Sequence, residues 1–214
     1  PQENQPDLPV YCLIRCNYRG DEKERIPITG QPPEFSGFEP ESMIYRDGRF
    51  FLVSLTTMKG IVTDKRGVFK RGFDFGAMVV EEEKDRADIE FSGFTLDEEG
   101  NFYFTAPVLF KVFKFSPEGK KMGAFGKPGG APGFFGVVSG VAVDQRGTIL
   151  VSDKLKSVVM VFDRNFQFLT QFGGRGNKPD SLTGPVDLVL DNSGKVYVTQ
   201  LRKRGVSVFS LNYN

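Results

Sequence analysis

The residue types that could carry out chemistry leave few routes to catalysis in this chain. Its 214 residues include no histidine. Without an imidazole, Ser-His-Asp and Cys-His nucleophile systems, histidine general bases and histidine-based metal sites are excluded. Calcium needs only oxygen ligands, and Asp153 and Asp187 are candidate carboxylates, but no Asp-x-Asp-x-Asp-Gly loop accompanies them. We therefore expect no catalytic residue, no metal and no cofactor.

The two cysteines, Cys12 and Cys16, lie four residues apart in YCLIRC. In a strand these positions share one face about 13 Å apart, from a rise of about 3.3 Å per residue, whereas a disulfide needs Cα atoms within about 7 Å. Either both are free thiols or the segment is not a strand. We expect two small apolar residues, with a disulfide in a turn as the alternative; two thiolates alone do not complete a tetrahedral metal shell.

Two glycine-rich segments resemble phosphate-binding loops in composition. They read GKPGGAPG (126–133) and GGRGNKPDS (173–181). Neither closes on Gly-Lys-Ser/Thr, and neither opens onto a predicted helix whose N-terminus could hold a phosphate. We interpret both as connectors between structural elements.

Those elements recur along the chain. An alternating apolar run is cut by a turn and resumes at SMIYRDGRFFLVS (42–54), SGFTLDEEGNFYFT (92–105), SGVAVDQRGTILVSD (139–153) and VDLVLDNSGKVYVT (186–199). In the three longer copies an Asp begins the turn and a Gly supplies the positive φ that closes it. Such a phrase predicts a β-hairpin.

Two markers share one period of 47 residues: the turn glycines and three downstream phenylalanines, namely Gly100, Gly147, Gly194, Phe115, Phe162 and Phe209. Each unit carries about four short alternating runs, seen best at 140–143, 148–152, 157–162 and 166–172. No window predicts a long amphipathic helix, although the acidic run 81–90 fits one or two helical turns. Four strands in a repeat of roughly 40–50 residues are typical of a β-propeller.

The repeat resembles that of the NHL-repeat β-propeller family. Residues 139–176 carry Gly-Val-Ala-Val-Asp-x-x-Gly, a strand ending near Ser-Asp, Val-x-Val-Phe, and Phe-Gly before a glycine-rich loop. The resemblance covers about residues 10–211; the Asp that follows the second strand is present only as Asp153, with Thr105 and Thr199 in the other long copies. Enzymes, sensors and scaffolds share this fold. The amidating-lyase and streptogramin-lyase activities that the resemblance implies use histidine, so neither can work here in the known way.

We therefore expect an all-β protein, a β-propeller of four-stranded antiparallel blades with four repeats and a partial N-terminal blade. Residues 1–9 are expected to form a polar tether and 10–214 a single domain, with phenylalanines packed between blades. Residues 10–16 and 25–29 fit the outer pair of the partial blade, which gives 17 strands. That number fits neither four nor five blades. We expect one of two arrangements. Either the N-terminal segment pairs with a C-terminal strand in a closing blade, or the chain is part of a larger parent with five or six blades.

The net charge of +1 hides an asymmetry. Residues 1–100 carry 13 Lys+Arg and 20 Asp+Glu, a net −7, whereas residues 101–214 carry 15 and 7, a net +8. Such runs are usually solvated surface; the sharper interpretation is complementarity to an acidic or bipolar partner. Some NHL propellers bind single-stranded RNA, but the basic segment 200–205 lacks interleaved aromatic residues for stacking, so a nucleic-acid partner is not expected.

The sequence favours a non-enzymatic binding scaffold or sensor-type propeller that contacts another protein within a larger complex. Its binding face would gather the loops between second and third strands and the connectors, at 54–57, 105–109, 152–156, 200–204, 126–138 and 173–184. The expected partner-binding residues are Asp153, Lys154, Lys156, Arg202, Lys203 and Arg204. The enzymatic alternative is a calcium-dependent lactonase or esterase-like propeller. No run of 18 apolar residues predicts a membrane span. No signal peptide is visible, but the chain begins on Pro and not on Met, as a processed chain would. We therefore expect a periplasmic or secreted protein.

Overall fold

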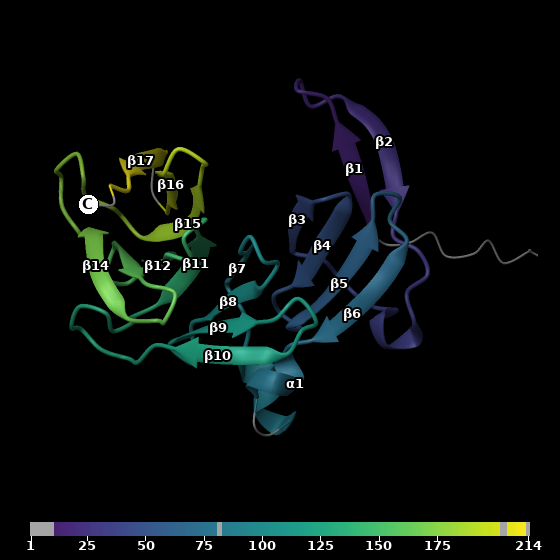
Figure 1. Ribbon diagram of the computed structural model, residues 1–214, viewed down its shortest axis with the longest axis horizontal. Helices are drawn as coiled ribbons and strands as arrows, with labels where there is room; N and C mark the ends of the chain where they lie inside the picture. Colours follow the sequence, from purple (N-terminus) through teal and green to yellow (C-terminus); the bar gives the residue numbers. More distant parts are fainter. Residues whose placement is uncertain (1–10, 81–82, 202–204, 213–214) are drawn as a thin grey trace, which may run out of the picture. The chain divides into compact units, whose positions relative to one another are not determined.

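The computed structural model describes residues 11–80, 83–201 and 205–212 (Figure 1). Their contacts group into two compact units, Pro1–Gly76 and Ala77–Asn214, here termed unit one and unit two. Besides strands, the described residues form only the helix α1 (Gly76–Val79) and the 3-10 helices η1 (Pro33–Phe35) and η2 (Glu83–Asp88). None of these helices has the length and apolar character of a membrane span. The expected tether, residues 1–9, lies outside the described residues.

Unit two contains three consecutive antiparallel sheets, coloured from teal to yellow in Figure 1. Their strands are β7 (Gly93–Leu96), β8 (Phe102–Ala106), β9 (Lys111–Phe115) and β10 (Lys121–Phe125); β11 (Val138–Val143), β12 (Ile149–Asp153), β13 (Val158–Phe162) and β14 (Phe168–Gly173); and β15 (Pro185–Leu190), β16 (Lys195–Gln200) and β17 (Val206–Ser210). Each sheet follows chain order, and β11 contacts both β7 and β15. This is the meander of propeller blades whose first strands are innermost.

Unit one contains one complete blade and one hairpin. The blade is β3 (Ser42–Arg46), β4 (Arg49–Ser54), β5 (Lys59–Asp64) and β6 (Phe69–Asp74), and the hairpin is β1 (Cys12–Cys16) with β2 (Glu22–Pro27). The predicted propeller fold, with its partial N-terminal blade and 17 strands, is therefore confirmed for the described residues. The closing blade and the single domain over 10–214 concern the relation between the two units and stay predictions.

The strands form where apolar, often β-branched or aromatic residues run continuously. Every residue of β8, β12 and β13 is buried, as expected for central strands covered on both faces. Phenylalanines join neighbouring blades of unit two: the ring of Phe125 on β10 lies 4.8 Å from that of Phe162 on β13. The prediction that phenylalanines pack between blades is confirmed there.

The predicted hairpin turns are present at all three glycines. The φ angles of Gly100, Gly147 and Gly194 are 82°, 80° and 78°. In the middle copy, Oδ1 of Asp144 accepts hydrogen bonds from the N–H groups of Arg146 and Thr148 at 2.8 and 2.7 Å. The Asp side chain and the left-handed Gly together fix the turn, which explains why the two residues recur as a pair.

Glycine and hydroxyl residues let the inner strands of unit two lie close together. A Cβ atom on Gly140 would approach the Cα of Asp187 to 2.7 Å, and one on Gly93 would collide with the carbonyl oxygen of Ser139. The Thr105 hydroxyl donates to that same carbonyl. Hydrogen bonds between blades therefore supplement apolar packing at the innermost strands.

Two smaller expectations have mixed outcomes. Cys12 and Cys16 are free thiols in β1, as their spacing in a strand predicts. Cys16 is exposed, so it is not packed as a small apolar residue, because β1 pairs only with the hairpin partner β2 among the described strands. The acidic run 81–90 includes the short helix η2, although residues 81–82 lie outside the described residues.

Candidate functional site

The loops between second and third strands and the connectors between blades lie at the same end of each blade, because the chain alternates direction from strand to strand. In unit two this end, here termed the loop face, comprises residues 107–110, 154–157, Leu201 and the connectors 126–137 and 174–184. The segment 126–133 lies in the first connector, and the segment 173–181 begins at the last residue of β14 and continues into the second connector. Their predicted role as connectors is confirmed.

Asp153 organises the loop face from inside. Its side chain is fully buried at the end of β12. Oδ2 accepts a hydrogen bond from Gly136 N–H at 2.6 Å, and Oδ1 accepts from Val137 and Lys156 N–H at 3.1 and 2.9 Å. The carboxylate is thus used within the domain, so Asp153 positions the connector and does not present its charge to a partner as expected from the sequence.

Gln200 repeats this arrangement one blade later. Its Oε1 accepts the Thr183 N–H at 2.6 Å, and Thr183 lies 47 residues after Gly136. Strand pairing places Asp153 opposite Val138 and Gln200 opposite Pro185. The position that matches Asp153 is therefore occupied by Ala106 and Gln200, one residue beyond the Thr105 and Thr199 assigned from the sequence.

The predicted basic residues differ in their availability. The Lys156 ammonium group donates to the carbonyl oxygens of Ala131 and Phe134 at 2.7 and 2.9 Å, so it braces the connector. Lys154 is half-buried, and no described residue accepts a hydrogen bond from its ammonium group. Arg202, Lys203 and Arg204 lie outside the described residues. Among the described basic residues predicted for the site, Lys154 is free to meet a partner.

Sequence reasoning missed the apolar character of the loop face. Large apolar side chains are exposed there at Val108, Phe134, Val137, Leu155 and Leu201. Leu155 is 55% and Leu201 63% exposed. Exposed apolar side chains gathered on one surface mark interaction sites more often than isolated ones do. These apolar residues are visible in the sequence as interruptions of otherwise polar loops, but the sequence analysis weighed only the charged residues of these loops.

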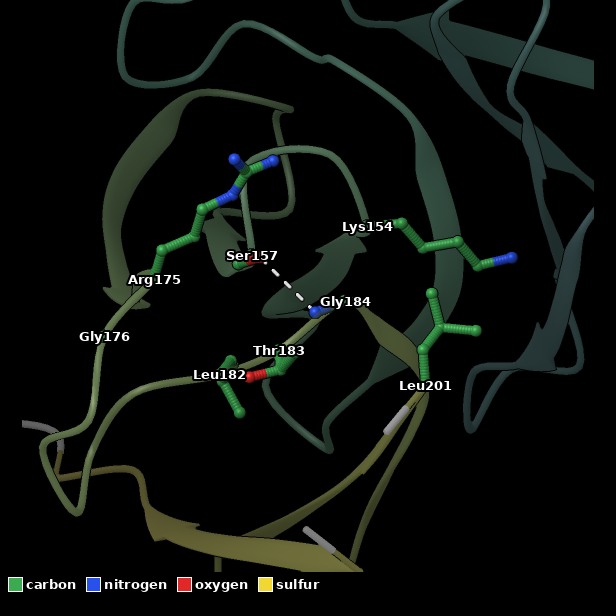
Figure 2. A pocket seen from close by; sticks show the side chains of 8 residues that line it. All are labelled: Lys154, Ser157, Arg175, Gly176, Leu182, Thr183, Gly184 and Leu201. Atoms are coloured by element: carbon green, nitrogen blue, oxygen red, sulfur yellow. Dashed lines mark hydrogen bonds between the residues drawn. The ribbon is translucent and has the colours of Figure 1, made fainter. Parts of the chain in front are cut away.

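An open hollow of about 330 Å³ lies within this face (Figure 2). It is lined by Lys154, Ser157, Arg175, Gly176, Leu182, Thr183, Gly184 and Leu201. Leu182 and Ser157 are buried at its base, whereas Arg175 and Leu201 are exposed at its edges. One guanidinium N–H of Arg175 donates to the Leu155 carbonyl at 2.8 Å, which holds the side chain in place.

The base of the hollow depends on unusual backbone geometry. Ser157 and Gly184 both have left-handed φ angles, 61° and 56°. The Gly184 N–H donates to Ser157 Oγ at 3.3 Å, drawn as the dashed line in Figure 2. A Cβ on Gly184 would lie 2.7 Å from Leu201 Cδ1, so glycine here leaves room for the exposed leucine.

A second polar cluster lies away from the loop face and is structural. Asp97 Oδ2 accepts from the Tyr103 hydroxyl at 3.2 Å and lies 3.5 Å from the Lys114 ammonium group. Burial, reinforced by the charge of Asp97, raises the pKa of Tyr103. A tyrosine held this firmly in its neutral form is a poor proton acceptor at neutral pH. Within residues 11–80, 83–201 and 205–212, no three His, Cys, Asp or Glu side chains form a metal-binding group.

Comparisons with solved structures agree with the propeller fold. A protein of unknown function from Bacteroides caccae is 15% identical, with a TM-score of 0.61, over 92% of this chain and 69% of its own. Streptogramin B lyase is 12% identical, with a TM-score of 0.58, over 92% of this chain and 61% of its own. At such identities the likeness supports the fold alone.

Sequence comparison gives a relative that matches only part of this chain. Mouse peptidyl-glycine alpha-amidating monooxygenase is 31% identical over 109 residues, 46% of this chain. This chain spans only 11% of that protein's length. No family model matches the chain. The class of protein defined here is thus a β-propeller with a loop-face hollow in unit two.

Proposed function

We propose that this chain is a non-enzymatic binding scaffold of the NHL-repeat type, which contacts another protein through the loop face of unit two. One observation carries the proposal: apolar side chains stand exposed on rigidly held loops beside cationic side chains. Asp153 and Gln200 fix the connectors, so Leu155 and Leu201 are presented on an ordered frame. Ordering the loops in advance lowers the entropy that a partner must remove on binding.

The charge of this half of the sequence suggests the character of the partner. Residues 101–214 carry a net +8, and Lys154 and Arg175 lie at the hollow. An acidic protein surface would meet complementary charge around an apolar centre, the usual anatomy of an interface. We further propose a periplasmic or secreted setting and membership of a larger complex.

The enzymatic alternative rests on the likeness to streptogramin B lyase, whose name denotes an enzyme. For this chain the alternative is a calcium-dependent lactonase or esterase-like propeller. Its candidate carboxylate Asp153 already accepts three backbone N–H groups. Calcium titration followed by calorimetry tests it: tight binding of one calcium ion per chain would favour the enzyme over the scaffold.

Site-specific photo-crosslinking tests the scaffold directly. A benzoylphenylalanine replaces Val108 or Leu155 on the loop face in cells that produce the protein. Leu169 on β14, exposed but off the loop face, is the matched control position. We expect one crosslinked protein at both loop-face positions and none at the control. Equal crosslinking at all three positions, or none on the loop face, would contradict the proposal.

A further inference from the structure

The internal repeat allows the junction that contains the hollow to be compared with the preceding blade junction, position by position. Residues 47 positions before its lining residues occupy the preceding blade junction, between β10 and β11. The match is structural as well as numerical: Lys154 N–H donates to the Val137 carbonyl at 2.8 Å, and Leu201 N–H donates to the Gly184 carbonyl at 3.0 Å. Likewise, a Cβ on Gly126 would collide with Phe135, and one on Gly173 would lie 2.6 Å from Leu182.

In the preceding junction the corresponding space holds large side chains. Ser157, Leu182 and Gly184 stand where that junction has Phe110, Phe135 and Val137. Phe135 is fully buried in an apolar cluster with residues of β8, β9 and β11–β13, and Phe110 packs against that cluster. The reductions from Phe110 to Ser157 and from Phe135 to Leu182 therefore open the hollow, whereas Val137, the counterpart of Gly184, is itself exposed. No change of backbone accompanies the first of these reductions, since Phe110 and Ser157 share a left-handed φ of 53° and 61°.

Two cationic side chains lie at the β14–β15 junction, where the hollow is. Lys154 and Arg175 replace Pro107 and Pro128 of the preceding repeat. Among the described residues that line the hollow there is no carboxylate. The β14–β15 junction thus has an apolar base and a cationic rim where the β10–β11 junction has packed aromatic side chains. Such a site suits a ligand that carries both an apolar group and negative charge.

The placement of the cations favours an extended chain over a compact anion. In Figure 2 the side chains of Lys154 and Arg175 lie at opposite edges of the hollow and extend in different directions. A single small anion would meet one of them, whereas a peptide crossing the hollow could pair with both. The exposed Leu155 and Leu201 extend the apolar surface along such a path.

We propose that the hollow binds a short acidic segment of a partner protein, with an apolar side chain over Leu182 and Leu201 and flanking carboxylates paired with Arg175 and Lys154. This inference rests on the proposed scaffold function and specifies the element that the scaffold recognises. The volume of about 330 Å³ suits one large side chain with adjoining backbone, near the lower end of ligand pockets.

The test is selection from a phage-displayed library of random octapeptides, followed by fluorescence polarisation with the enriched peptides. Ser157→Phe refills the hollow with the residue that the preceding repeat carries on the same backbone. Arg175→Glu reverses a rim charge, and Arg164→Glu reverses an exposed charge at the β13–β14 turn, away from the loop face. As a surface change, Arg175→Glu keeps the test valid even if Ser157→Phe impairs folding.

We expect the native chain to enrich peptides that have an apolar residue flanked by acidic ones. Ser157→Phe and Arg175→Glu should each weaken binding at least about tenfold, as loss of a buried contact or charge pair does, while the control Arg164→Glu binds normally. No enrichment, enriched peptides without acidic residues, unchanged binding by Ser157→Phe or Arg175→Glu, or equal weakening by Arg164→Glu would overturn the proposal.

Two further outcomes separate this inference from the scaffold function. Millimolar N-acetyl-leucine that shifts the amide resonances of Thr183 and Gly184 while no peptide is enriched would identify a small acid as the occupant and overturn the peptide assignment. A crosslinked partner at Leu155 that persists in both hollow variants would retain the scaffold and overturn the hollow as its recognition element. Peptide selection without any crosslinked partner would support the hollow alone.

Discussion

Gly147 closes the turn between β11 and β12 with a left-handed backbone, φ 80°, that a β-branched residue adopts only under strain. A Cβ there would also lie 3.2 Å from the Cβ of Arg164. Gly147→Val should therefore lower the free energy of unfolding by about 1–3 kcal/mol. Urea denaturation measures the loss. Gly130→Val, in open space without a left-handed φ, should stay within about 0.5 kcal/mol. Equal stability of the two variants would contradict this account.

Asp191, which begins the turn between β15 and β16, should also titrate abnormally. The Ser193 hydroxyl, followed by the Lys195 and Ser193 N–H groups and the Tyr197 hydroxyl, lowers the pKa of Asp191 to about 2. Because the folded-state pKa lies below the unfolded value of about 3.9, the stabilisation is present above the unfolded pKa. It is lost as pH falls from about 4 towards 2. Carboxyl ¹³C shifts across that range measure the midpoint; a value near 4 would contradict the hydrogen-bonded turn.

At the scale of single elements, the connector 126–137 depends on one buried carboxylate. Asp153→Ala would leave the N–H groups of Gly136, Val137 and Lys156 without their acceptor. An unsatisfied buried group costs about 1–3 kcal/mol; because these three N–H groups are only partly buried, we expect a combined loss of about 2 kcal/mol in unfolding free energy. Amide hydrogen exchange should accelerate at Gly136 and Val137. Asp153→Asn, which keeps one acceptor, should lie between the parent and the alanine variant. Unchanged exchange in Asp153→Ala would refute the clamp.

Sequence reasoning predicted the strands well because they follow local rules. The four runs expected between residues 140 and 172 correspond to β11–β14 within two residues at each end. Alternation and paired Asp and Gly turns are encoded within a few neighbouring residues. The site was predicted less well. The burial of Asp153 depends on Gly136 and Val137, which are 17 and 16 residues away, and strand spacing does not reveal which loop side chains remain uncovered.

The hollow illustrates what a sequence reading of one repeat at a time overlooks. Ser157 and Gly184 are ordinary loop residues in isolation, and Arg175 lay in a segment interpreted only as a connector. Their significance appears when the two junctions of unit two are compared, with Phe110 and Val137 at the equivalent positions. Tertiary contacts establish that equivalence, since the carbonyls of Val137 and Gly184 accept matching hydrogen bonds.

At the scale of the whole molecule, the uneven distribution of charge should govern association. Residues 1–100 carry −7 and residues 101–214 carry +8, and exposed charges are screened over about 10 Å at 0.1 M salt. Once crosslinking identifies the partner, stopped-flow measurement should show association slowing as salt rises. Reversing Arg202, Lys203 and Arg204 to Glu should slow it further at low salt. Association that is independent of salt and unaffected by the reversal would exclude electrostatic steering.

The shared left-handed backbone at Phe110 and Ser157 makes this fold a ready substrate for engineering. Because the backbone conformation is the same at both positions, their side chains can be exchanged between the two junctions without rebuilding the loop. Shortening Phe110 and Phe135 in the β10–β11 junction should create a second cleft beside the first, at a cost in stability from the emptied space. Repeat duplication allows the same change in nature. One copy of a repeat keeps its packed junction, while substitutions in its neighbour create a binding site with a new specificity.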